Sequence, residues 1–195
     1  MQFNWKRTTA VVAALVLFST GLVFASPRMT PSERSVYASE RASRLLAEIQ
    51  NQAADLTKHA GTLEAMARQP QYSWQSHAFY LERVKDHINA VGVNTAELQR
   101  ISADAQPWQQ RAISQVTSHA AQVAASTQAA IVYLNDNQGR LFVPEYKGHV
   151  ATIADSSQNM KQAVDQFLDY QNAQQAAWQA QQKLQHLQNT LELGE

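Results

Sequence analysis

The chain has 195 residues, with 16 basic and 16 acidic side chains, no cysteine and a formal net charge of zero. It has no block of like charge, which argues against nucleic acid or an anionic membrane surface as its partner. The lack of cysteine excludes disulfide bonds, a thiol nucleophile and thiolate ligands for zinc. Stability must therefore come from a packed core.

The first segment, MQFNWKRTTAVVAALVLFSTGLVFAS, has the order of a secretory signal peptide. Two cations precede an apolar run that ends in small residues, which predicts a leader over residues 1–25, cleaved between Ala25 and Ser26. We therefore expect a periplasmic or secreted protein. The alternative is an uncleaved membrane anchor, because the apolar stretch is about as long as the shortest spanning helices. Cleavage would leave 14 basic residues against 16 acidic ones.

A first helix is predicted over about 31–69. Thr30 can cap it, Pro31 suits its first position, and Glu33 completes a capping box. Pro70 biases the chain out of the helix at its other end. Between these ends the predicted seam alternates by four and three residues for four heptads, as in a coiled coil: Ala38, Ala42, Leu45, Ile49, Gln52, Leu56, His59, Leu63 and Met66.

The same spacing predicts a second helix over 73–105 and a third over 107–136. The second seam runs from Trp74 through His77 and Leu98, and we expect a kink at Gly92–Asn94, where one helix could end and another begin. The third helix starts at a proline, and its seam is again apolar: Ile113, Val116, Ala120, Val123, Thr127, Ala130 and Leu134.

A fourth helix is predicted over 145–190, and its apolar seam thins along its length. It begins with Val150, Ile153, Met160, Val164 and Phe167, and then enters QNAQQAAWQAQQKLQHLQNT, where Trp178, Leu184, Leu187 and Leu191 are sparse anchors. The composition favours a solvated extension maintained by helix propensity. The alternative is a tail that binds a partner, because an isolated polar helix is marginally stable.

Four helices with short connections predict an all-α fold, an antiparallel up-down four-helix bundle with coiled-coil-like packing. Residues 26–195 have the length of one ordinary domain. No strand pattern or internal repeat competes with this prediction.

The third connection, LNDNQGRLFVPEY, first suggests a site because it concentrates turn-forming and charged residues. As an EF-hand it would place Asp136, Gly139 and Glu145 at ligand or turn positions, but its first ligand position is the apolar Leu134. The stretch IVYLNDNQGRLFV also resembles the strand-turn-strand of PAS-like sensor folds, although its flanks are helical rather than strands.

We interpret the third connection as a plain turn. Asn135 or Asn137 would end the third helix in the left-handed conformation, and Gly139 would turn the chain. Leu141 to Val143 would cover one end of the core. On this interpretation Phe142→Ala lowers stability by about 1 to 3 kcal/mol if the ring is buried, whereas replacing Asp136 has little effect.

Three histidines form the main candidate site. The up-down topology could bring His59, His77 and His149 toward one end of the bundle, with Glu64, Glu82 or Glu145 as further metal ligands. The ordinary alternative is that each histidine is a hydrogen-bonded seam residue that sets register. Because no motif spacing supports a metal centre, we assign no metal, cofactor or catalytic residue.

No catalytic motif of the serine, phosphate-loop or zinc-protease type occurs in the sequence. The leading hypothesis is an exported, non-enzymatic helical bundle that acts through contacts with a protein partner, as an accessory, chaperone-like or envelope-associated protein. The alternative is a periplasmic carrier of a small ligand or metal that uses the His59, His77 and His149 cluster. The oligomeric state is left open.

Overall fold

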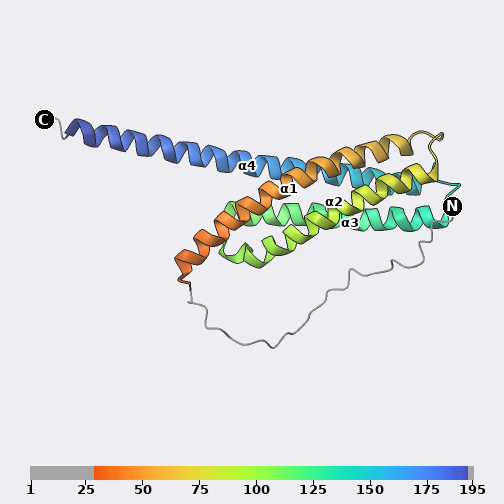
Figure 1. Ribbon diagram of the computed structural model, residues 1–195, viewed down its shortest axis with the longest axis horizontal. Coiled ribbons are helices and arrows are strands. Elements are labelled where there is room, and N and C mark those ends of the chain that lie inside the picture. The colour runs from red at the N-terminus through yellow and green to blue at the C-terminus, as the bar shows by residue number, and fades with distance from the viewer. Residues whose placement is uncertain (1–28, 193–195) are drawn as a thin grey trace, which may run out of the picture.

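The computed structural model describes residues 29–192, so the predicted signal peptide at residues 1–25 lies outside the described residues. The described part contains four α-helices, one short 3₁₀ helix and no strand (Figure 1). Their bounds are α1 Pro31–Ala67, α2 Trp74–Ile101, η1 Ser102–Asp104, α3 Pro107–Asp136 and α4 Pro144–Glu192.

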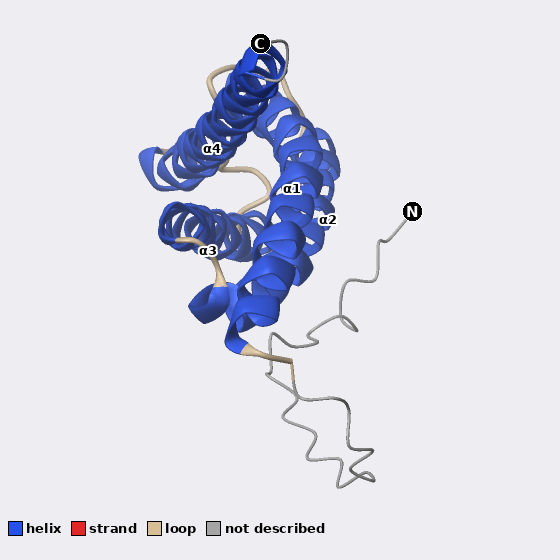
Figure 2. Ribbon diagram, turned by 90° about the vertical axis from the view of Figure 1, so that its left-hand side faces the viewer, coloured by secondary structure: helices blue, strands red, loops and turns tan. Residues whose placement is uncertain are grey.

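The four helices form an up-down bundle. Each helix runs opposite to the one before it, and α4 extends far beyond the other three (Figure 1). Each helix packs on the next, and α4 returns to α1, whereas α1 and α3 lie diagonally and barely touch. Figure 2 shows α1 and α2 on one side and α3 and α4 on the other. The all-helical, four-helix prediction is confirmed.

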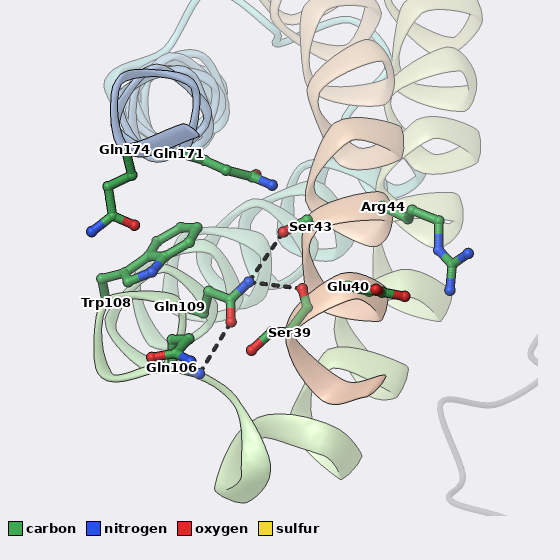
Figure 3. A pocket seen from close by; sticks show the side chains of 9 residues that line it. All are labelled: Ser39, Glu40, Ser43, Arg44, Gln106, Trp108, Gln109, Gln171 and Gln174. Carbon is green, nitrogen blue, oxygen red and sulfur yellow. Dashed lines mark hydrogen bonds between the residues drawn. The ribbon is translucent and has the colours of Figure 1, made fainter. Parts of the chain in front are cut away.

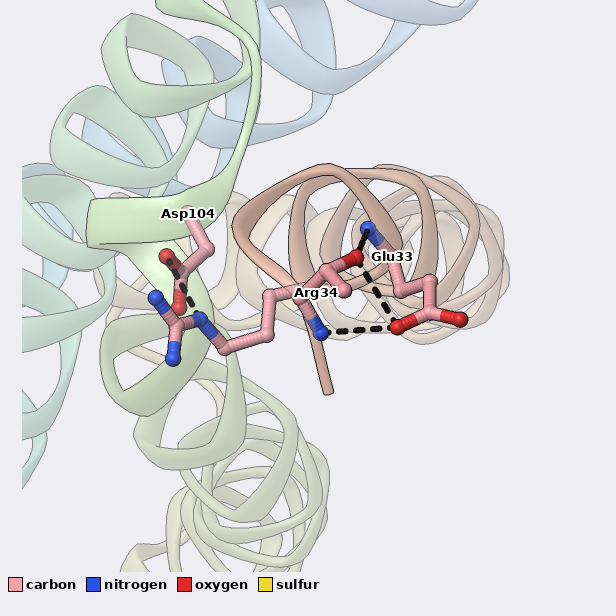
Figure 4. A network of polar contacts seen from close by, with 4 residues as sticks. Glu33, Arg34 and Asp104 are labelled. Carbon is pink, nitrogen blue, oxygen red and sulfur yellow. Dashed lines mark hydrogen bonds and ion pairs between the residues drawn. The ribbon is translucent and has the colours of Figure 1, made fainter. Parts of the chain in front are cut away.

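Helix α1 begins as predicted. The Thr30 backbone N–H donates to Glu33 Oε2 at 2.7 Å, and the Glu33 N–H donates to Thr30 Oγ1 at 3.3 Å, which completes the capping box. Beside it, Arg34 Nε lies 3.9 Å from Asp104 Oδ1 of η1 (Figure 4). Both ion-pair side chains are about half exposed, so this pair contributes little stability.

In the middle of α1, the buried face is shifted by one position along the chain from the predicted seam. Ala53 and Ala60 are fully buried, whereas Gln52 and His59 are only partly buried. Alanine allows neighbouring helices to approach closely, so the packing places the small residues inward. Gln52 and His59 instead lie beside α2, where Gln52 Oε1 accepts from Asn94 Nδ2 at 3.3 Å.

Helix α2 is continuous through the expected kink at Gly92–Asn94. Asn94 is buried and reaches across to α1, so it acts as an interhelical contact rather than as a cap. Thr95 Oγ1 donates to the Gly92 carbonyl at 3.0 Å within the helix. The helix ends at Ile101, earlier than the predicted 105, because η1 tightens the chain into a 3₁₀ turn. Its seam is buried as predicted from His77 to Leu98.

The third connection is a turn between α3 and α4, but two details of the interpretation are wrong. Asn137 has φ −134° and ψ 42°, so α3 does not end in the left-handed conformation there. Phe142 is 50% exposed, and its ring lies under Lys147 with Nζ 3.3 Å from the centroid. Leu141 and Val143 do pack against the core, each partly buried.

Tyr146, in the first turn of α4, fills the place that was expected for Phe142. It is the largest of the fully buried side chains. Its ring lies 5.8 Å from that of Tyr133 and 5.4 Å from that of His77. The aromatic side chain that fills this part of the core is therefore Tyr146 of the helix rather than Phe142 of the loop.

Helix α4 is 49 residues long and has two parts. Its first part contributes buried residues to the bundle, from Tyr146 to Val164, with Phe167 and Leu168 partly buried. Every residue from Asn172 to Asn189 is exposed. Among the described residues, no helix has the length and apolar character required to cross a membrane.

Candidate functional site

The predicted histidine cluster is not formed. His77 is buried against Tyr146, His59 stacks on His87 with ring centroids 5.0 Å apart, and His149 is partly exposed. Within residues 29–192, no three His, Cys, Asp or Glu side chains come together in a way that could hold a metal ion. His59 lies beside Tyr80 and His87 of α2, whereas His77 lies inside the core against Tyr146.

His77 and Tyr146 form a buried polar pair. His77 Nδ1 lies 3.0 Å from the Tyr146 hydroxyl. Burial lowers the pKa of His77 and raises the pKa of Tyr146 far above its ordinary value, so both groups are neutral near pH 7. A neutral phenol can donate its proton to Nδ1. Both rings are buried, so the pair is a hydrogen bond across the core between α2 and α4.

A polar groove lies at the opposite end of the bundle, where α4 leaves it (Figure 3). Its volume is about 650 Å³, and its walls come from α1, α3 and α4: Ser39, Glu40, Ser43, Arg44, Gln106, Trp108, Gln109, Gln171 and Gln174. The groove was not predicted from the sequence, because its residues come from three different helices and share no motif.

Gln109 forms the floor of this groove and is 1% exposed. Its Nε2 donates to the Ser39 carbonyl at 2.8 Å and contacts Ser43 Oγ at 3.1 Å, while its Oε1 accepts from the Gln106 backbone N–H at 3.1 Å. These bonds connect the start of α3 to α1. The buried Ser39 hydroxyl beside them has no hydrogen-bond partner.

Trp108 marks the point where α4 separates from the bundle. Its ring lies 6.5 Å from that of Phe167 and 5.5 Å from that of Tyr170. Tyr170 is still 47% exposed. Beyond it, α4 continues without support from α1, α2 or α3 (Figure 1). We refer to residues 170–192 as the α4 extension.

The α4 extension carries large apolar side chains in water. Trp178, Leu184 and Leu187 are 61%, 62% and 59% exposed. At about 3.6 residues per turn, Leu184 and Leu187 lie on the side of α4 opposite Val164, whereas Trp178 continues the side that faces the core. The helix therefore has two separate apolar features.

The leucines belong to a longer stripe of small and large apolar residues. It has the alternating spacing of three and four that is typical of a coiled-coil seam. We call it the outer stripe, and it consists of Tyr170, Ala173, Ala177, Ala180, Leu184, Leu187 and Leu191. From Tyr170 to Leu191, Lys183 is the only lysine, arginine, aspartate or glutamate.

A comparison of the chain with protein-family models, with curated proteins and with solved structures finds no match. No known ligand or activity can therefore be carried over to this chain. Of the surfaces described above, the α4 extension is the one whose exposure is hardest to explain by the stability of the bundle alone. It is the main candidate for the functional surface.

Proposed function

We propose that the protein is an exported, non-enzymatic helical bundle that acts through protein–protein contacts, and that the α4 extension is its contact element. The observation that supports this proposal is the length of exposed helix beyond Tyr170, with leucines about 60% exposed on one side of it. Exposed apolar side chains that line one side of a helix are typical of an interaction site.

The physical support for this proposal is that the extension, without a partner, is only marginally stable as a helix. An isolated polar helix of about 20 residues is marginally stable in water, because few contacts offset the entropy of ordering it. Glutamine and alanine favour helix, but they give no reason for three leucines in one stripe. Burial of those leucines against another helix would stabilise both the helix and the contact.

The buried titratable groups support a non-enzymatic role. His77 and Tyr146 have perturbed pKa values, which often mark a catalytic site. Here they bind each other inside the core, and packing accounts for both. We assign no catalytic role to any residue.

Export is the second part of the proposal, and it rests on the order of residues in positions 1–25. The intact mass of the protein purified from its own cells tests it. We expect a chain that begins at Ser26 in the periplasmic or secreted fraction. A chain that retains residues 1–25 in the cytoplasm would contradict export, and one that retains them in the membrane would favour the uncleaved anchor.

Site-specific photo-crosslinking in the native compartment tests the contact role. A photoreactive residue at Gln188, beside the outer stripe, should give a defined adduct with a protein. The same residue at Val132, which is 50% exposed on α3, serves as the position control and should not give that adduct.

Charge substitutions make this test specific. Leu187→Asp should abolish the Gln188 adduct, because it places a carboxylate on the outer stripe. Gln179→Asp puts the same charge on another side of the helix and should leave the adduct intact. The proposal fails if Gln188 gives no adduct, or if Leu187→Asp and Gln179→Asp behave alike.

A second candidate function is the binding of a small polar ligand in the groove beside Trp108. The observation that favours it is a groove of about 650 Å³ with an indole wall and the unpartnered hydroxyl of Ser39. Native mass spectrometry of protein never exposed to chelator should then show a bound mass that Trp108→Ala removes. An apo mass alone would contradict this candidate.

A further inference from the structure

The outer stripe is divided by size along the helix. Its first half carries the small residues Ala173, Ala177 and Ala180, and its second half carries Leu184 and Leu187, continued in the sequence by Leu191. A helix that pairs with this stripe must present large residues to the first half and small residues to the second. The stripe itself, reversed in direction, has that order.

We propose that the α4 extension binds the α4 extension of a second copy of this chain in an antiparallel coiled coil. This inference rests on the proposed function, since it names the partner of the same surface. One register sets Leu184 against Ala180 of the second copy and Leu187 against Ala177 of the second copy. The two-fold axis repeats each pair.

In this register, every layer of the coiled coil has a similar side-chain volume. In an antiparallel coiled coil, each seam residue faces a residue of the alternate seam position on the partner helix. Here every leucine faces an alanine, so that each layer has a similar volume and leaves neither a void nor a clash. Parallel pairing would instead place leucine against leucine at one end and alanine against alanine at the other.

The length of the extension supports the same register. The axis of symmetry falls close to Gln182, in the middle of the extension. The end of each α4 helix then reaches the level of Tyr170 in the second copy, where the rest of that bundle begins. The antiparallel direction puts the two bundles at opposite ends of the paired helices. From Ala173 onward the outer stripe faces away from its own bundle, so the second helix does not collide with that bundle.

Charge favours a second copy over a strongly charged partner. The flanks of the outer stripe are mainly glutamine, and Lys183 is the single formal charge between Tyr170 and Leu191. Two copies therefore approach with little long-range repulsion. In the proposed register the two Lys183 side chains lie on the same flank near the axis, where they repel each other weakly.

Analytical ultracentrifugation of the purified protein, with no other protein present, is the first test. We expect a reversible monomer–dimer equilibrium over the micromolar range. Leu187→Asp should raise the dimer dissociation constant by about tenfold or more, because it buries a charge without a partner. Gln179→Asp, the matched control, should leave it unchanged. Each variant should keep the melting temperature of the bundle, since these residues lie outside it.

Disulfide trapping tests whether the two helices pair in the antiparallel direction. The chain has no native cysteine, so only the introduced cysteines can form disulfides. Ala177→Cys chains mixed with Leu187→Cys chains should form mixed disulfides, because those positions face each other in the antiparallel register. In parallel pairing the two positions would be about 15 Å apart, and each variant would instead link to itself.

Salt and Lys183 give an independent measurement. Added salt should tighten the dimer slightly, because it screens the two lysines, and Lys183→Gln should remove that dependence. In a parallel pair the two Lys183 side chains would lie on opposite flanks, and neither change would matter.

The outcomes separate this inference from the proposed function. A protein that stays monomeric at every concentration overturns the inference, whereas the proposed function stands if Gln188 still crosslinks to a different protein and Leu187→Asp abolishes the adduct. A dimer that Leu187→Asp does not weaken also overturns the inference, because it forms through another surface. Self-linked disulfides in place of mixed ones overturn the antiparallel arrangement.

Discussion

Tyr146 and His77 show how one hydrogen bond joins two helices at the end of the core. Both residues are almost fully buried, so each polar atom requires a partner inside the protein. The 3.0 Å contact between Nδ1 and the phenol supplies it. The pair therefore aligns the start of α4 with the start of α2, and it is sensitive to both side-chain chemistry and pH.

Tyr146→Phe should lower the free energy of unfolding by about 1 to 3 kcal/mol. The ring still fills the core, but His77 Nδ1 loses its partner while it stays buried. Urea denaturation followed by circular dichroism measures this change. Tyr133→Phe is the control, because the Tyr133 hydroxyl makes only an exposed 3.5 Å contact with the Arg140 carbonyl. Equal effects of the two substitutions would contradict a role for the buried hydrogen bond.

The same pair should make the protein sensitive to acid. Burial lowers the pKa of His77 below its ordinary 6.5. As the pH falls below about 6.5, the unfolded chain therefore binds a proton before the folded chain does, and stability is lost. Above that pH the histidine makes no pH-dependent contribution. His59, whose pKa is lowered by burial and by the neighbouring His87, acts in the same direction.

Urea midpoints measured between about pH 8 and pH 5 test this behaviour. The midpoint of the wild-type protein should fall below pH 6.5, and that of His77→Phe should fall less steeply, because the substituted chain has no proton to take up there. Parallel profiles for the two proteins would show that His77 is not responsible.

At the scale of elements, α2 shows why a possible break in sequence need not break a helix. Gly92 lowers helix propensity, but the helix on either side is held by buried residues, among them Ile88, Val91 and Leu98. The energy of burying such side chains, about 1.5 to 3 kcal/mol each, exceeds the roughly 1 kcal/mol that one glycine costs. The helix therefore continues through Gly92 to Ile101.

Gly92→Ala should raise the free energy of unfolding by about 0.5 to 1 kcal/mol. An added Cβ meets no atom within 4 Å, and the backbone there is helical. The gain comes from the higher helix propensity of alanine and the smaller entropy of the unfolded chain. Thermal unfolding measures it. Gly61→Ala in α1 is a matched second site with the same open surroundings. A loss of stability at 92 alone would show that this position requires glycine.

The third connection should be more sensitive at Leu141 than at Phe142. Leu141 packs against the core, and its removal should cost about 1 kcal/mol for the apolar area lost. Phe142 is half exposed and covered by Lys147, so Phe142→Ala should cost about 0.5 kcal/mol or less. Chemical denaturation of the two alanine variants measures these losses. A larger loss of stability for Phe142→Ala would support the prediction that the Phe142 ring covers one end of the core.

At the scale of the whole molecule, the chain divides into a packed bundle and a helix that leaves it. Among the described residues, the contacts of Trp108 with Phe167 and Tyr170 are the last aromatic contacts between α4 and the bundle. Beyond them every residue from Asn172 to Asn189 is exposed. Stability is therefore concentrated in the bundle, while the extension remains available for binding.

Removal of residues 173–195 should leave the melting temperature of the bundle nearly unchanged, because none of the described side chains in that segment is buried. The helical signal should fall roughly in proportion to the residues removed. Thermal unfolding of the truncated and full-length proteins at low concentration, where association is weak, compares them directly. A large drop in melting temperature would mean that the extension supports the fold and would weaken its assignment as a contact element.

The sequence by itself determined the helices and their order, because caps, prolines and apolar spacing act locally or over a few turns. Thr30, Pro31 and Glu33 set the start of α1, Pro107 set the start of α3, and short connections required antiparallel neighbours. The buried face of α3 also followed from spacing alone.

Only the tertiary structure decided which of two adjacent residues points inward. Seam spacings of 3.5 and 3.6 residues differ too little to distinguish Gln52 from Ala53 or His59 from Ala60. Spacing alone therefore does not show that His59 is only partly buried, beside His87. It was also the assembled core, where Tyr146 meets His77 of α2 and Tyr133 of α3, that buried Tyr146 rather than Phe142. These choices depend on how closely whole helices approach one another, and that distance is a property of the assembled core rather than of any one segment.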